Sequence, residues 1–448
     1  MNDSKVTKRM ATHVAAIRDL PLDEELKIQV KKVLMDYLCA AIAGSGTEVS
    51  QLVYQYMLES EGEGKSPIIG HKIGLSKTAA AFVNGTSAHS LDMDDGHTAG
   101  SIHPGTVVFP AVLAAAEKVS PDFDLFAKSV IAGYETCLRL SAGMHPSSRK
   151  RGFHNTPVAG IFGATAAVSV LYGLEREEIR NAFGISASFA GGLFAFLGTG
   201  SEVKRIHPGQ AARDALMAVE LTQKGLTGPK SVFEGENGVF QGFAGKDVSV
   251  DRLFVQIGEQ YEIMNVYFKP YPCCRHLHSS IDAIYKLKEQ IELNTNEISK
   301  IRIGVNQIAY MHRHTECQTI LDAQMSLPYS VASAVVHPVL KMNHFDPNQV
   351  DERVRSLIGH IEVYIDKEAD QAYPAERASN VEIIFRNGEN LSWRVANPLG
   401  EPSNPLTYQQ LEQKFLANCA PFIGEDRCKE LLVSLDNIEK NMNFLYQI

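Results

Sequence analysis

The chain has 448 residues, 44% of them hydrophobic, and a formal net charge of −9 at pH 7. This length allows a large core and two domains, while the negative charge argues against nucleic acid or an anionic membrane as a partner. Seven scattered cysteines, an odd number, favour a reducing compartment over a disulfide framework. The first residues are too polar for a signal peptide, and no apolar run approaches the roughly 18–20 residues of a membrane span. The sequence therefore predicts a soluble cytoplasmic protein.

The first 260 residues show hydrophobic spacing typical of helices. One helix is predicted over 23–43, where Gly44-Ser-Gly ends it. Further helical patterns lie at 76–90, 106–119, 123–143, 157–172, 176–189 and 209–225. Many of these segments are rich in Ala, Gly and Ser, so the helices can approach one another closely. An antiparallel bundle or an orthogonal packing of helices fits this pattern.

The pattern then changes to alternation of apolar and polar residues. Strands are predicted at 301–305, 361–365, 381–385 and 391–395, the last two joined by a hairpin at Asn387-Gly388. Helices are predicted at 277–291 and 326–340, and again from about 407 to the end. The predicted fold is mainly α with α+β: a large helical domain (1–266), a small α+β lid domain (267–398) and C-terminal helices (399–448) that complete the first domain. A ligand cleft is expected between the domains.

The stretch 89–105 concentrates acidic and imidazole side chains in a connection between two predicted helices. It holds Asp92, Asp94, Asp95, His97 and His103. Groups crowded in this way perturb one another's pKa values, as they do in active sites. Gly96 and Gly100 are expected to allow unusual backbone angles there. The alternative is a capped turn, in which the Asp side chains accept hydrogen bonds from backbone N–H groups.

Three predicted helix starts place a histidine at or just before a proline. They are His103-Pro104-Gly105, His154-Asn-Thr-Pro157 and His207-Pro208-Gly209. Helix N-termini carry partial positive charge and favour anions. The alternative is that these residues only mark the starts of helices and bind no ligand. Beside the third start, a Gly/Ser loop at 198–201 leads to Lys204 and Arg205, which suit carboxylate or phosphate binding unless they are simply solvated.

A further cluster of polar side chains lies at 267–278, at the predicted domain junction. Lys269 and Arg275 are expected to face an anionic ligand, and His276 and His278 lie close by in the sequence. Cys273-Cys274 lacks the CxxC spacing of a zinc site, although a catalytic thiol remains an alternative. His312 and His314, farther along the chain, are predicted to be surface residues.

In combination these stretches resemble the MmgE/PrpD family, which includes 2-methylcitrate dehydratase, cis-aconitate decarboxylase and iminodisuccinate epimerase. The matching motifs are Ser90-Leu-Asp-Met-Asp-Asp, Ile102-His-Pro-Gly, Gly152-Phe-His154, Lys204-x-x-His-Pro-Gly-Gln-Ala-Ala-Arg213 and Lys269-Pro-Tyr-Pro-Cys-Cys-Arg-His. The similarity covers nearly the whole chain. It implies a large all-α domain, a smaller α+β domain, a homodimer and an active site that needs no metal or organic cofactor. The family's site residues match Asp92, His103, His154, Lys204 and Lys269, and Tyr310 more loosely.

Two differences separate this sequence from the family pattern. Gly96-His97 follows Asp95 where dehydratase and decarboxylase members usually carry Thr, and the spacing to His103 is one residue longer. Cys274 stands where the decarboxylase carries a His after the lid lysine.

The residues and the resemblance together predict proton transfer at a carbon beside a carboxylate of a small di- or tricarboxylic acid. The most favoured reaction is that of a 2-methylcitrate dehydratase-like lyase, with an epimerase or a cis-aconitate decarboxylase-like enzyme as alternatives. His103, oriented by Asp92, is predicted to transfer the proton, because histidine suits acid or base work near neutral pH. The predicted catalytic residues are Asp92, His97, His103, His154 and Lys269. The predicted substrate-binding residues are Lys204, Arg205, His207, Arg275, His276 and Tyr310.

Two other classes of protein remain as alternatives. A metal-dependent hydrolase would use Asp94, Asp95, His97 and His103 as ligands. A non-catalytic carboxylate-binding protein or helical scaffold would bind citrate-like acids without turnover.

Overall fold

The computed structural model describes residues 6–197 and 201–448 and divides into two compact units. Unit 1 comprises Met1–Ser90, Asp94–Tyr267 and Thr407–Ile448, and unit 2 comprises Leu91–Met93 and Phe268–Leu406. Unit 1 is helical and unit 2 combines helices with a four-stranded sheet, which confirms the predicted fold class. Within the described ranges, every helix is too short or too polar to cross a bilayer.

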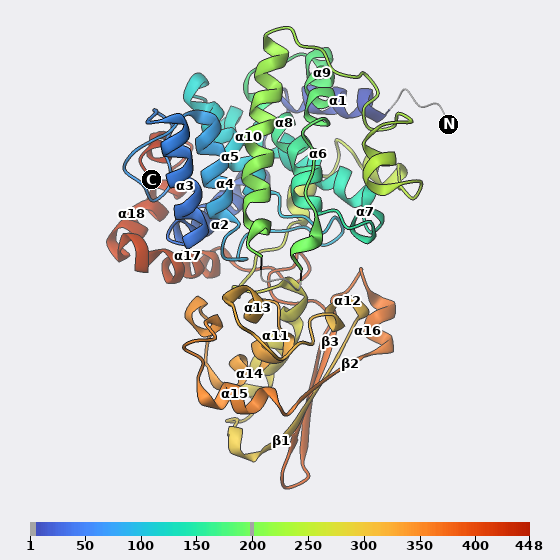
Figure 1. Ribbon diagram of the computed structural model, residues 1–448, viewed down its shortest axis with the longest axis vertical. Coiled ribbons are helices and arrows are strands. Elements are labelled where there is room, and N and C mark those ends of the chain that lie inside the picture. The colour runs from blue at the N-terminus through green and yellow to red at the C-terminus, as the bar shows by residue number, and fades with distance from the viewer. Residues whose placement is uncertain (1–5, 198–200) are drawn as a thin grey trace. The chain divides into compact units, whose positions relative to one another are not determined.

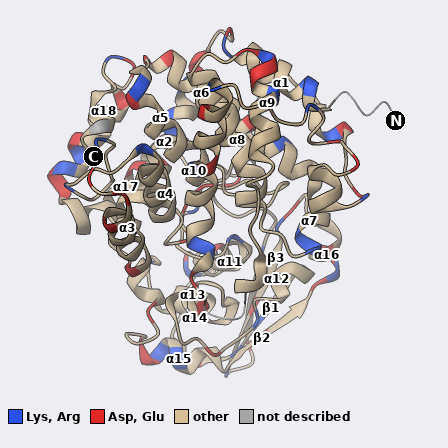
Figure 2. Cartoon of the chain, turned by 45° about the horizontal axis from the view of Figure 1, so that its top comes forward, with Lys and Arg blue, Asp and Glu red and all other residues tan. Residues whose placement is uncertain are grey.

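Unit 1 is built from helices that pack around a buried centre. Its helices are α1 (Val6–Ile17), α2 (Glu24–Ser45), α3 (Glu48–Glu61), α4 (Lys77–Ala88), α5 (Gly105–Val119), α6 (Phe123–Met144), α7 (Ser147–Lys150), α8 (Asn155–Leu171), α9 (Arg176–Ser186), α10 (Val203–Gln223), α17 (Tyr408–Ile423) and α18 (Glu425–Asp436). Helices α5, α6 and α10 pack against α8 (Figure 1). Every residue of α8 is buried, and the helix has no charged side chain (Figure 2).

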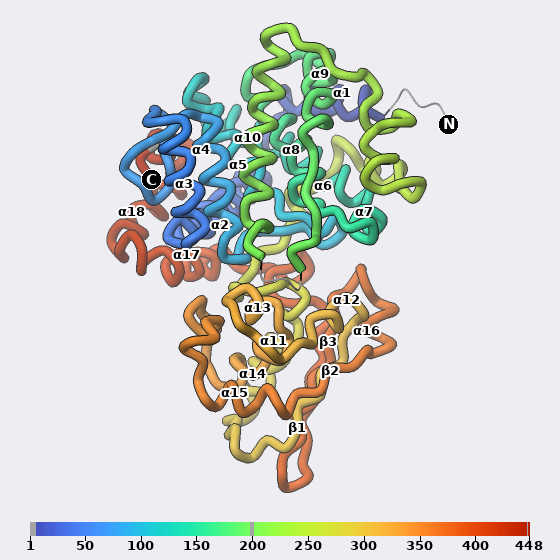
Figure 3. The backbone as a smooth tube through the Cα atoms, viewed as in Figure 1, coloured from blue at the N-terminus to red at the C-terminus, as the bar shows by residue number. Residues whose placement is uncertain are grey.

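Some helices begin at side-chain caps that the sequence contains. The Asp23 carboxylate accepts a hydrogen bond from the Leu26 N–H and begins α2, and Thr407 forms a capping box with Gln410 at the start of α17. Helix α17 returns to pack on α2, as the tube in Figure 3 shows. There Lys414 Nζ lies 2.5 Å from Asp36 Oδ1, and both side chains are buried.

Two of the three predicted histidine-proline helix starts are confirmed. His103 precedes α5 and His154 is the N-cap residue of α8. The third prediction is wrong, because α10 begins at Val203 and encloses both His207 and Pro208. Pro208 lies inside α10, and because proline is typical of the first helical position, it placed the predicted start too late in the sequence. Gly198, Thr199 and Gly200 of the predicted loop lie outside the described residues.

Helices α4 and α10 cross at two glycines. A Cβ atom added to Gly85 would lie 2.6 Å from the Gly209 Cα, and one added to Gly209 would lie 2.1 Å from the Phe82 carbonyl oxygen. The crossing therefore depends on the absence of side chains at both positions, as the richness in small residues predicts. It brings α10, with Lys204 and His207, close to α4, which ends one residue before His89.

Unit 2 contains a mixed sheet in the order β2-β1-β3-β4. Its strands are β1 (Ile298–Val305), β2 (Ile361–Ile365), β3 (Ser379–Phe385) and β4 (Asn390–Val395). Strands β1 and β2 are parallel, and the other two pairs are antiparallel. All four strands were predicted, as was the β3–β4 turn, where Gly388 has a φ of +90°. The helices are α11 (His278–Lys288), α12 (Gln307–Tyr310), α13 (Ile320–Gln324), α14 (Leu327–Val336), α15 (Glu352–Ile358) and α16 (Lys367–Ala372).

The short segment Leu91–Met93 belongs to unit 2 although unit 1 precedes and follows it in the chain. The Gln324 side-chain amide donates a hydrogen bond of 2.7 Å to the Leu91 carbonyl oxygen. Asp92, the middle residue, has a φ of +54°, a left-handed conformation that Asp tolerates better than most residues. The unusual backbone angles thus fall on Asp92 and Ser101, whereas Gly96 and Gly100 have no positive φ.

The glycine crossing yields a stability prediction. We expect Gly209→Ala to lower the free energy of unfolding by about 1–3 kcal/mol, because the new methyl group would overlap the backbone of α4. Urea unfolding measures the change. Gly242→Ala is the matched control, since an added Cβ there has no atom within 4 Å. Equal free energies of unfolding for the two variants would show that α4 and α10 can move apart without a loss of stability.

Candidate active site

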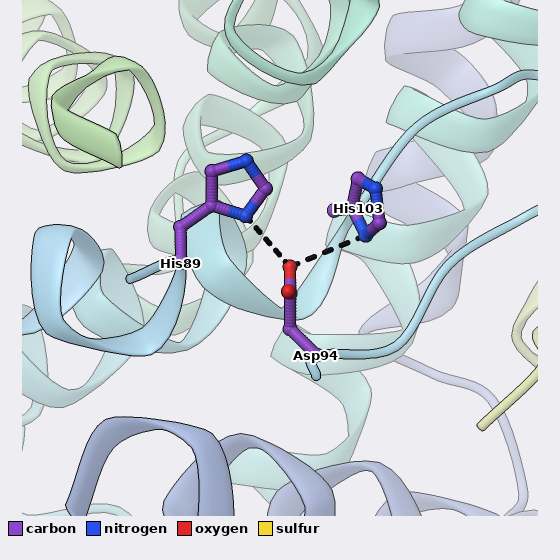
Figure 4. Close-up of side chains that lie close together, drawn as sticks. All are labelled: His89, Asp94 and His103. Carbon is purple, nitrogen blue, oxygen red and sulfur yellow. Dashed lines mark hydrogen bonds and ion pairs between the residues drawn. The ribbon is translucent and has the colours of Figure 1, made fainter. Parts of the chain in front are cut away.

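A buried carboxylate lies between two imidazole rings in unit 1. Asp94 Oδ2 is 2.8 Å from His89 Nδ1 and 3.2 Å from His103 Nδ1 (Figure 4). His89 directly follows α4, and His103 precedes α5, so two helix ends position the rings. The side chains of His89 and Asp94 are almost completely buried, whereas 15% of the His103 side chain is exposed.

The hydrogen bonds of His103 determine its tautomer. Its Nδ1 lies 2.7 Å from the Asp95 carbonyl oxygen. A carbonyl oxygen only accepts hydrogen bonds, so Nδ1 carries a hydrogen and donates it. In the neutral ring, Nε2 then holds the lone pair and is the atom that can accept a proton. The partly exposed His103 is therefore oriented as a base.

Burial and neighbouring charges separate the protonation states within this cluster. Burial lowers the pKa of His89 to about 4, even though Asp94 favours the charged ring. Burial alone would raise the pKa of Asp94, but the two imidazoles hold it well below its usual range. At neutral pH the cluster therefore holds an ionised Asp94 beside a neutral His89.

Two more histidines extend the cluster. His154 Nδ1 lies 3.0 Å from His207 Nδ1, and the His154 ring stacks on His89 with centroids 5.9 Å apart. Burial lowers the pKa of both His154 and His207, and the positive charge of Lys204 lowers them further. Lys204 is itself buried. A lysine among neutral imidazoles suits the binding of an anion.

Unit 2 holds a second set of predicted residues. Lys269 Nζ lies 3.2 Å from Asp92 Oδ1 and donates a hydrogen bond of 2.8 Å to the Asp92 carbonyl oxygen. Both side chains are buried. The carboxylate that contacts His103 is thus Asp94, two residues after the predicted Asp92, which instead forms an ion pair with Lys269.

Arg275 holds a loop of unit 2. Its guanidinium lies 3.1 Å from the Glu401 carboxylate and donates hydrogen bonds to the Leu399 and Pro398 carbonyl oxygens. Arg275 was predicted to bind substrate, but these contacts give it a structural part in fixing residues 398–401.

Other predicted residues lie in different surroundings. His97 Nε2 is 3.5 Å from Glu262 Oε2, and Arg205 pairs with Glu202 at 2.7 Å. In unit 2, the His276 ring stacks on His312 with centroids 5.9 Å apart, and the Arg313 guanidinium lies 4.4 Å from the centre of the Tyr310 ring.

Sequence reasoning missed His89 as a member of the site. It begins the stretch 89–105, but it lies directly after a small-residue helix and carries no motif of its own. Its spacing of five residues from Asp94 was the available signal. The capped-turn alternative describes Asp95, whose carboxylate accepts hydrogen bonds from the Gly105 N–H and the Tyr134 hydroxyl. Burial and the charge of Asp36 raise the pKa of Asp95 to about 8.

The predicted metal ligand set does not form, because Asp95 and His97 make the other contacts described above. His89, Asp94 and His103 do place one potential ligand atom each within 4.8 Å of the others. A metal ion binds imidazole through a nitrogen lone pair, yet His103 Nδ1 donates its hydrogen to the Asp95 carbonyl. A metal bound at this atom would require the His103 ring to turn.

The fold and this cluster define a mainly helical, two-unit protein with a buried carboxylate–histidine site. The MmgE/PrpD N-terminal domain matches residues 8–251, and the MmgE/PrpD C-terminal domain matches residues 271–440. The chain therefore belongs to the MmgE/PrpD family.

Named relatives align over nearly the full length. A cis-aconitate decarboxylase-like protein, oryM, of Aspergillus oryzae is 26% identical over 98% of this chain and 95% of its own. The cis-aconitate decarboxylase of Homo sapiens is 26% identical over 97% of this chain and 92% of its own. The cis-aconitate decarboxylase of Aspergillus terreus is 26% identical over 94% of this chain and 91% of its own.

Because His89 is buried, we expect the stability of the folded protein to depend on pH. Its folded pKa of about 4 lies below the unfolded value of about 6.5. The unfolded chain therefore binds the proton more readily, and stability falls as the pH drops from about 6.5 toward 4. We expect His89→Asn, which can keep a donor to Asp94, to flatten this slope by up to about 1.4 kcal/mol per pH unit.

Urea unfolding between pH 7 and 4.5 measures the slope. His314→Asn is the control, because the His314 side chain is exposed. Parallel profiles for wild type and His89→Asn would contradict a neutral, buried His89.

Proposed function

We propose that this protein is a lyase that transfers a proton at a carbon beside a carboxylate of a small di- or tricarboxylic acid. His103 Nε2 is the proton-transferring atom. The observation that carries this proposal is the fixed tautomer of His103, with Nδ1–H held by the Asp95 carbonyl and by Asp94 Oδ2. The family and the names of the relatives support the class of substrate.

Each neighbouring residue has a separate part in the proposed step. When His103 takes a proton, the ionised Asp94 stabilises the imidazolium and keeps the ring oriented, as the carboxylate of a catalytic triad does. His89 stays neutral, so it does not offset the negative charge of Asp94 that stabilises the His103 imidazolium. Lys204 offers positive charge to a substrate carboxylate, where negative charge develops as the neighbouring carbon loses its proton or its carboxyl group.

Two reactions are consistent with this step. In a decarboxylation, carbon dioxide leaves and the remaining electron pair takes a proton from the His103 imidazolium. The names of the relatives support this reaction. In a 2-methylcitrate dehydratase-like reaction, neutral His103 removes a proton and a second group protonates the departing hydroxyl. Cys274 and Gly96-His97 depart from the family pattern and argue against a direct transfer of either relative's reaction to this chain.

Proton NMR in deuterated water distinguishes the candidates. Chelator-treated protein is incubated separately with 2-methylcitrate, citrate, cis-aconitate and iminodisuccinate. Loss of carbon dioxide with uptake of deuterium identifies a decarboxylase, and loss of water identifies a dehydratase. Deuterium exchange with inversion and no loss of either identifies an epimerase. Turnover that appears only after metal is restored would contradict the proposed metal-free step.

His103→Asn tests the assigned atom. Asn keeps a side-chain donor toward the Asp95 carbonyl but lacks the Nε2 atom. We expect turnover of the substrate found above to fall by about 10²–10⁴-fold with little change in stability. His314→Asn serves as the control for the loss of an exposed imidazole. Turnover within a few-fold of wild type in His103→Asn would show that another group transfers the proton.

Lys204→Met tests the binding of the substrate carboxylate. We expect the KM to rise by at least about tenfold, since a buried charge-assisted contact would be lost. The pKa values of His154 and His207 should rise, because the lysine charge now lowers them. Steady-state kinetics and NMR titration of the imidazoles measure the two effects. An unchanged KM together with shifted imidazole pKa values would place Lys204 near the histidines but away from the substrate.

A further inference from the structure

Unit 2 contains a cysteine and a histidine that take no part in the proposed proton transfer. Cys274 Sγ lies 3.8 Å from His312 Nε2. Cys274 is partly exposed, whereas His312 is buried. The prediction that His312 lies on the surface is therefore wrong, although His314 is exposed. The two residues lie 38 positions apart in the chain, so only the fold brings them together.

The segment 324–327 fixes the geometry of this pair. The Cys274 N–H donates to the Gln324 carbonyl oxygen at 3.0 Å, and the Leu327 N–H donates to the His312 carbonyl oxygen at 2.8 Å. His312 Nδ1 lies 2.9 Å from the Met325 carbonyl oxygen. Because that oxygen only accepts, Nδ1 carries a hydrogen, and the Nε2 lone pair of the neutral ring faces the sulfur.

We propose that Cys274 and His312 form a thiolate–imidazolium pair, which makes Cys274 a reactive site for small, soft electrophiles. The arrangement has the three parts of an activated nucleophile: a thiol, a base within reach of it, and a third group, the Met325 carbonyl, that orients the base. The proton of the thiol moves from Sγ to His312 Nε2, which leaves a negative sulfur beside a positive ring.

The electrostatic surroundings support this ionisation. Burial alone would raise the pKa of Cys274, but the charge and hydrogen bond of His312 lower it below that of an ordinary thiol. Burial alone would lower the pKa of His312, yet Cys274 and the Met325 carbonyl raise it. Both directions favour the ion pair over the neutral pair.

Other charged groups near the pair have opposing effects. The carboxylate of Asp92 raises the pKa of both Cys274 and His312, so it opposes the thiolate but favours the imidazolium. Asp92 is itself paired with Lys269. The positive charges of Lys269 and Arg275 lower the pKa of the adjacent Cys273, but burial raises it well above its ordinary value. Cys273 is therefore the inert member of the vicinal cysteines.

Cys317 provides an internal comparison. It is partly exposed, like Cys274, but burial raises its pKa to about 11. The two thiols should therefore differ in the pH at which they react.

Alkylation of the full-length protein by iodoacetamide tests the proposal. The thiolate attacks the carbon that bears iodine, an S–C bond forms, iodide leaves, and His312 keeps the proton. Peptide mass spectrometry follows Cys274 and Cys317 separately between pH 5 and 10. We expect the alkylation rate at Cys274 to reach half its maximum at a pH below about 8.5, which is the pKa of a free thiol. At pH 7, Cys274 should react at least about tenfold faster than Cys317.

The ultraviolet absorbance of the thiolate gives a measurement that does not depend on reagent access. The difference between wild type and Cys274→Ser should titrate below the ordinary thiol range. In His312→Gln, which can keep a donor to the Met325 carbonyl but loses the base, the Cys274 midpoint should move upward by at least one pH unit. A wild-type midpoint at or above that of a free thiol, or an unchanged midpoint in a folded His312→Gln, would overturn the proposal. Neither measurement depends on which acid the protein converts.

Discussion

The buried negative charge of Asp94 is the constraint around which the site is organised. A carboxylate removed from water needs compensating partners, or it becomes protonated. Here the partners are imidazoles from two different helix ends, His89 after α4 and His103 before α5. Helix α4, which His89 follows, also packs on α10 at Gly85 and Gly209. Small displacements of the helices would separate the charge from its donors.

The histidine cluster has an uneven distribution of charge. Burial keeps His89, His154 and His207 neutral, so these rings supply shape and hydrogen bonds without accumulating positive charge. Lys204 supplies a positive charge that acts on His154, and Asp94 supplies a negative charge in contact with His103.

Local patterns in the sequence were sufficient for much of the fold and only for part of the site. Periodicity located α2 and all four strands, and Asn387-Gly388 located the hairpin, because these features depend on neighbouring residues. The stretch 89–105 correctly indicated where carboxylates and imidazoles gather. Local patterns did not show that α10 begins before His207, since Pro208, a residue typical of helix starts, lies inside the helix. The burial of His312 and the pairing of Asp92 with Lys269 depend on contacts between distant segments, which no local pattern contains.

The assignment of Leu91–Met93 to unit 2 has a consequence for how the protein can be divided. A fragment comprising only residues 268–406 would contain the whole sheet and the buried hydrophobic cluster of unit 2, yet it would lack Leu91–Met93, which lie far earlier in the chain. Lys269 would then be deprived of the Asp92 carboxylate, and the Gln324 amide of the Leu91 carbonyl. Unit 2 is thus built from two separate stretches of chain, and residues 268–406 alone lack the contacts that Leu91–Met93 make.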